Sequence, residues 1–115
     1  MKTDKELLEL AAKAAGYAVY KYIESYDDYY WHGPINGLQI QGSEVPVWNP
    51  LTDDGDALRL AVRLNLLVDF QSRAAMPCDK PGKDADWCGG EHNEDAAADC
   101  RRAIVRAAAA IGATK

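Results

Sequence analysis

Positive charge is scarce in this 115-residue sequence. It has 13 lysine and arginine residues against 18 aspartate and glutamate residues, a formal net charge of −5. Nucleic-acid binding depends mainly on neutralising phosphates, so this balance disfavours a general nucleic-acid-binding protein. No lysine/arginine cluster with interleaved aromatic residues offsets the deficit.

Long apolar runs are also missing. No stretch approaches the roughly 18 apolar residues of a membrane-spanning helix. Residues 1–6 are polar and lead directly into a predicted helix, unlike a signal peptide. Three cysteines, an odd number, fit a reducing compartment better than a disulfide framework. These features predict a cytoplasmic protein that does not contact a membrane.

Recognisable catalytic patterns are lacking too. The sequence has no phosphate-binding glycine loop, no nucleophile elbow and no paired-carboxylate glycosidase pattern. We therefore assign no catalytic residue and no cofactor. What the chain does contain is 48% hydrophobic and 27% charged residues, the balance of a globular protein. The length predicts one domain covering residues 1–115.

The most informative stretch covers residues 48–64. Pro50 disfavours helix at the preceding residue, and Thr52, Asp53 and Asp54 can each cap a helix that begins after it. Apolar residues then recur at helical spacing, namely Ala57, Leu60, Ala61 and Leu64. Leu58 and Val62 lie beside this set.

Two further helices are expected, one near each end of the chain. Thr3 and Glu6 form a capping box, and Gly16 suits the end of the first helix. The last helix begins near residues 93–95 and ends at Gly112. Its predicted inner stripe is Ala96, Ala97, Cys100, Ile104, Ala107, Ala108 and Ile111. Arg101, Arg102 and Arg106 should lie outside it.

Strands are predicted between the helices. The candidates are residues 17–23, 35–41 with Asn36-Gly37 as a tight turn, 45–48, and 66–71 as a buried strand. Residues 73–90 have the composition of a long loop with a brief strand near residues 86–88. This order predicts an α+β fold in which a small antiparallel or mixed sheet packs with about three helices.

Residues 3–16, 48–64 and 100–112 resemble, in that order, a family of small phage and prophage proteins described as the phage α-β-α sandwich domain. The stretch WNPLTDDGDALRLAVRL at 48–64 is the most specific of the three. The resemblance implies an α-β-α sandwich and an origin in a phage or prophage. The function of the family is unknown, so the resemblance brings no catalytic residues.

Two segments hold candidate site residues. Tyr29, Tyr30, Trp31 and His32 could stack on a ligand, although such an aromatic cluster more often covers a small core. Cys78, Cys88 and His92 could bind zinc, but Cys78 is too distant in sequence for the usual ligand spacing. Ordinary thiols are the simpler interpretation.

The sequence favours an accessory protein that acts by contact with a host or phage protein in the bacterial cytoplasm. One alternative is a small metal-dependent or thiol enzyme that uses Cys78, Cys88 and His92. Another is a narrow nucleic-acid function through the arginines of the last helix. A homodimer through residues 26–31 or a sheet edge is also a candidate, because Tyr and Trp suit interfaces.

Overall fold

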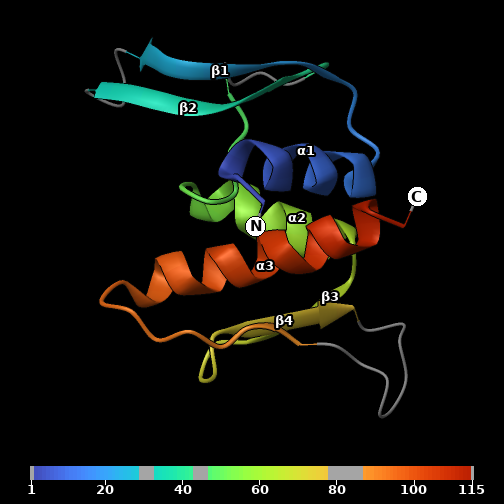
Figure 1. Ribbon diagram of the computed structural model, residues 1–115, viewed down its shortest axis with the longest axis vertical. Helices are drawn as coiled ribbons and strands as arrows, with labels where there is room; N and C mark the ends of the chain where they lie inside the picture. Colours follow the sequence, from blue (N-terminus) through green and yellow to red (C-terminus); the bar gives the residue numbers. More distant parts are fainter. Residues whose placement is uncertain (1, 29–32, 43–46, 78–86, 115) are drawn as a thin grey trace.

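The computed structural model describes residues 2–28, 33–42, 47–77 and 87–114. Three helices and five strands lie in these ranges (Figure 1). In chain order they are α1 (Asp4–Ala15), β1 (Val19–Asp28), β2 (Gly33–Ile40), α2 (Asp54–Arg63), β3 (Leu66–Asp69), β4 (Ala74–Pro77), β5 (Cys88–Gly89) and α3 (Ala96–Gly112).

The strands form two antiparallel sheets. β1 pairs with β2, and a second sheet has the order β3-β4-β5. The three helices lie between the sheets, with β1–β2 beyond α1 and β3–β4–β5 beneath α3 (Figure 1). The structure confirms the predicted α+β class with three helices and antiparallel pairing, but the strands form two sheets where the sequence predicts one.

Local signals at the helix starts are confirmed. Thr3 and Glu6 form the capping box of α1, and Gly16 closes that helix with a φ of 80°. Asp53 is the N-cap of α2 and accepts a hydrogen bond from the backbone N–H of Asp56. Asp95 caps α3 in the same way through Ala98. No helix in the described ranges is long and apolar enough to cross a membrane.

The core lies where the three helices meet. Leu60 of α2 is 0% exposed and Ile104 of α3 is 5% exposed, and both belong to one buried cluster, as predicted. Gly112 has a different role from the predicted one, because it is the last residue of α3 rather than its terminator. A Cβ there would overlap the carbonyl oxygen of Leu10, so the glycine permits close packing of α3 on α1.

The α3 stripe also begins later than predicted. Ala96 and Ala97 are exposed because they stand on the first turn, whereas Ala103 and Val105 are fully buried. Leu58 and Val62 of α2 are exposed rather than part of the buried side.

Several predicted strand features were wrong. Asn36 and Gly37 lie inside β2, where Gly37 pairs with Ile23, so they are not a turn. A Cβ on Gly37 would come within 2.6 Å of the Trp48 carbonyl oxygen, which explains the glycine by close backbone approach.

The sequence predicts a buried strand over residues 66–71, but β3 is a half-exposed edge strand that ends at Asp69. The buried central strand is β4, which lies in the predicted loop. The composition of β4 resembles that of a loop, because Ala74 and Ala75 are small and Pro77 ends the strand. The brief strand near residue 88 is confirmed as β5.

Trp48 forms an isolated bridge with Leu38 and an edge-to-face contact with Tyr17, with ring centroids 5.5 Å apart. Residues 45 and 46 of that predicted strand lie outside the described ranges.

Candidate functional site

The polar residues before α2 are used inside the fold. The backbone N–H of Asn49 donates to Asp56 at 3.0 Å, and its side-chain amide donates to the carbonyl of Asn36 at 2.7 Å. Asn49 Oδ1 accepts from the N–H of Leu51, and Asp56 also accepts from Arg59 at 2.8 Å. Asn49 and Asp56 are both buried. Buried polar groups require such partners, so folding accounts for this part of the 48–64 stretch without a ligand.

An exposed apolar flank remains on α2. Leu58 is 62% exposed and Val62 is 72% exposed, and one helical turn separates them. On the other flank, Arg63 Nε donates to the carbonyl of Ala15, and its guanidinium lies 5.1 Å from the centre of the Tyr17 ring. These contacts show that the flank of α2 that carries Arg63 faces the C-terminal end of α1. Leu58 and Val62 each precede an arginine of α2 by one residue, so they occupy a separate flank of its exposed side, about 100° around the helix.

Exposed apolar residues also occur in the next strand and just after it. Only Leu64 and Asn65 separate α2 from β3, and Asn65 makes the sharp change of direction with a φ of 53°. Leu67 and Phe70 are exposed as well, by 47% and 68%. We refer to Leu58, Val62, Leu67 and Phe70 together as the α2–β3 surface. Exposed large apolar side chains on neighbouring elements are a feature of many protein contact sites.

β3 also presents an open backbone edge. The carbonyl of Arg73 accepts from the N–H of Gly90, so Arg73, Ala75 and Pro77 point their backbone groups towards β5. Alternate residues point the other way, and Ala74 and Met76 therefore bond to Asp69 and Leu67. The backbone groups of Leu66 and Val68 consequently point away from the sheet. Within the described ranges, no backbone group outside the sheet bonds to them.

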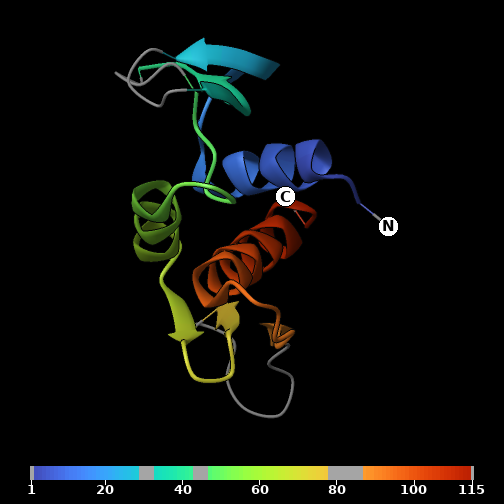
Figure 2. The same ribbon diagram turned by 90° about the vertical axis from the view of Figure 1, so that its left-hand side faces the viewer.

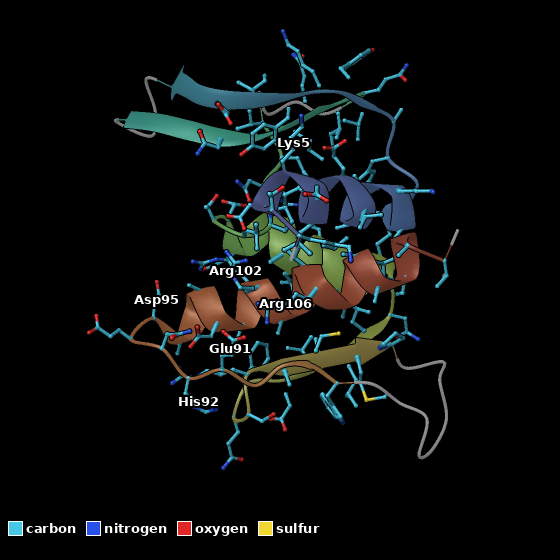
Figure 3. All side chains as sticks on the ribbon, in the orientation of Figure 1. Lys5, Glu91, His92, Asp95, Arg102 and Arg106 are labelled. Carbon is cyan, nitrogen blue, oxygen red and sulfur yellow. The ribbon has the colours of Figure 1, made fainter. Side chains whose placement is uncertain are left out.

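The arginines of α3 lie outside the core, as predicted, and each has an acidic partner. Arg101 pairs with Asp54, Arg102 with Asp4 at 3.1 Å, and Arg106 with Glu91 at 2.9 Å. Figure 3 shows Arg102 and Arg106 on the same side of α3. These pairs offset positive charge that a phosphate backbone would require.

A shallow groove of about 330 Å³ lies between α1 and α3. Lys2, Asp4, Arg102 and Arg106 surround it, and Leu7 and alanines of α3 supply its apolar lining. Asp4 and Arg102 already pair with each other across it. The groove is therefore a weaker candidate than the α2–β3 surface, because a ligand would have to replace that ion pair.

Asp99 fastens the second sheet to α3. Its carboxylate accepts hydrogen bonds from the side chain and backbone of Asn93, and it pairs with Arg73 at 2.7 Å. These hydrogen bonds, first those from Asn93 and then that from Arg73, lower the pKa of Asp99 to about 2. Arg73 also donates to the carbonyl of Asn93. The cluster joins the turn before β4 to the start of α3 and has a structural role.

The predicted aromatic site, Tyr29, Tyr30, Trp31 and His32, lies outside the described residues. So does Cys78 of the predicted zinc site. Cys88 is half-buried in β5 against the core, whereas His92 is exposed in the segment that follows (Figure 3). Among the residues that the structure describes, no group of three His, Cys, Asp or Glu side chains could hold a metal. Burial raises the pKa of the Cys100 thiol, which makes it less reactive.

Sequence reasoning missed the α2–β3 surface. The available signal for this surface was that Leu58 and Val62 are apolar but lie beside the inner stripe of the predicted helix. Comparison of this chain with protein-family models, curated proteins and solved structures finds no match.

Proposed function

We propose that this chain is a phage- or prophage-encoded accessory protein that acts by protein–protein contact in the bacterial cytoplasm. The α2–β3 surface is its docking site for a host or phage protein. The phage origin rests on the resemblance of residues 3–16, 48–64 and 100–112 to the phage α-β-α sandwich domain.

One observation carries the contact function. Leu58 and Val62 are exposed on α2, Leu67 is exposed on β3, and Phe70 is exposed in the turn that follows β3. Covering large apolar side chains of this kind is a main driving force of protein association. The backbone edge of β3 beside them offers directional hydrogen bonds as well.

The ion pairs on α3 favour this function over nucleic-acid binding. Arg101, Arg102 and Arg106 each have an acidic neighbour, so phosphate binding would require these pairs to separate. The net charge of −5 opposes phosphate binding further.

Partner capture with matched variants tests the proposal. Tagged wild-type protein, Leu58→Ser/Val62→Ser and Tyr20→Ser would each be incubated with lysate from induced lysogens, and retained proteins identified by mass spectrometry. Tyr20 is a suitable control because it is 67% exposed on β1, on the other side of the helices. We expect a partner that the double variant loses and the control retains. A partner retained equally by all three proteins would contradict the proposed site.

A further inference from the structure

We propose that the open edge of β3 binds an extended, basic segment of the partner protein as an added antiparallel strand, beside the exposed flank of α2. This inference rests on the proposed function and specifies the chemistry of the partner. The juxtaposition that supports it is a strand edge with which no described residue pairs, in contact with the helix α2, whose exposed side carries Leu58 and Val62.

The backbone of β3 provides the first requirement. Leu66 and Val68 direct their N–H and C=O groups away from β4, as the pairing of Arg73 with Gly90 fixes. An extended segment is the structure whose backbone matches such a row of donors and acceptors. Antiparallel pairing is favoured because its hydrogen bonds run perpendicular to the strands.

The flank of α2 provides the second requirement. A new strand would lie about 4.8 Å beyond β3, and its side chains would point alternately to either side of the sheet. Figure 2 shows α2 on the same outer side of the molecule as β3, which is the edge strand of its sheet. In the proposed complex, side chains of the added strand that point towards the helices meet Leu58 and Val62, which are exposed on α2. A segment with apolar residues at alternate positions satisfies this surface.

Negative charge at the end of β3 favours a partner segment that is basic. Asp69 ends β3, and its carboxylate accepts from the backbone N–H groups of Gln71 and Ser72. Hydrogen bonding to Ser72 lowers the pKa of Asp69 below its ordinary value, which favours the negatively charged form. In antiparallel pairing, a lysine or arginine before the apolar residues of the partner would lie beside Asp69. The chain's net charge of −5 attracts the same kind of segment.

A second copy of the chain fits this edge less well. In a symmetric dimer the two-fold axis would pass between the paired β3 strands. Because α2 lies on the same outer side of the molecule as β3 (Figure 2), the axis would bring the two copies of α2 close together. A single segment requires only the width of one strand. We therefore assign the edge to a partner segment.

A synthetic peptide provides the direct test. It has two lysines followed by alternating valine and threonine, and it is titrated into isotope-labelled full-length protein. We expect amide signals of Leu66 and Val68 to shift, and their hydrogen exchange to slow by at least about tenfold. A matched peptide with glutamates in place of lysines should bind at least about fivefold more weakly. No change at Leu66 and Val68 up to millimolar peptide would overturn the proposal.

Variants identify the groups responsible. Val68→Pro removes an outward N–H and leaves the bonds between β3 and β4 intact, so peptide affinity should fall at least about tenfold. Leu58→Ser/Val62→Ser, which keeps every backbone group, should weaken binding similarly. Tyr20→Ser should bind like the wild type. Equal peptide binding by Val68→Pro and wild type, with both shown to be folded by circular dichroism, would contradict strand addition.

Two outcomes separate this inference from the proposed function. If partner capture requires Leu58 and Val62 but survives Val68→Pro, the docking site stands and strand addition fails. A dimer in light scattering that Val68→Pro converts to a monomer would assign the edge to a second copy, against the inference.

Discussion

Asp99 shows how a single residue can link stability to pH. Its pKa is lowered from 3.8 to about 2 by hydrogen bonds from Asn93 and Arg73. A lowered pKa means that the folded state binds the proton more weakly than the unfolded state does. The stability that Asp99 contributes is therefore fully present above about pH 4 and is lost as pH falls towards 2.

We expect the melting temperature of the wild type to fall between pH 4 and pH 2 more steeply than that of Asp99→Asn. Asparagine cannot be protonated in this range, so the variant lacks the pH-dependent stability that the Asp99 carboxylate contributes. The variant should also be less stable than the wild type at neutral pH. Calorimetry across this range measures the effect. If the melting temperatures of the two proteins fall equally between pH 4 and pH 2, the Asp99 carboxylate does not stabilise the fold.

Residues also mark the limits of sequence reasoning. Thr3, Glu6 and Gly16 act on chain neighbours, so local chemistry was sufficient to place them. Asn49 bonds to Asn36 and Asp56, and Gly112 packs on Leu10. These partners are distant in sequence, and the composition of one stretch cannot reveal them.

At the scale of elements, α2 has two leucines in opposite environments. Leu60 is fully buried in the core, and Leu58 is 62% exposed two residues earlier. Leu60→Ala should therefore lower the free energy of unfolding by about 2–5 kcal/mol. Leu58→Ala should change it by less than about 0.5 kcal/mol. Chemical denaturation measures both values, and similar losses at the two positions would show that the faces of α2 are misassigned.

The β5 region carries the metal prediction. Cys88 packs against the core and His92 is exposed, while Cys78 lies outside the described ranges. If ordinary thiols are the correct interpretation, the purified protein should contain no stoichiometric zinc, and a chelator should leave its melting temperature unchanged. Elemental analysis and calorimetry check these points. One zinc per chain, with unfolding on chelation, would favour the metal-dependent alternative instead.

The helices were predictable because their apolar spacing and caps are local. The strands were harder to predict. The expected buried strand, β3, lies at the edge of its sheet, and the buried central strand, β4, lies in the expected loop. Leu66, Leu67 and Val68 form an apolar run that conceals which residues face outwards. Ala74 and Ala75 are small because α3 lies close to them, and this tertiary cause cannot be read from residues 74–77 alone.

For the whole molecule, the central claim is that contact occurs on the side formed by α2 and β3. The ion pairs of α3 and the bonded Asn49–Asp56 corner account for many polar groups elsewhere in the described ranges. The exposed apolar residues of α2 and β3 have no comparable structural explanation. Sequence reasoning indicated protein contact but not this surface, because exposure depends on which helix faces the core.

Photo-crosslinking in cells that carry the induced phage or prophage tests this claim most directly. A photoreactive phenylalanine analogue would replace Leu58, Val62 or Leu67 in turn, with Tyr20 on β1 as the control position. We expect one common crosslinked partner from the three α2–β3 positions and none from position 20. Crosslinks from position 20 alone, with none from the other three, would contradict it.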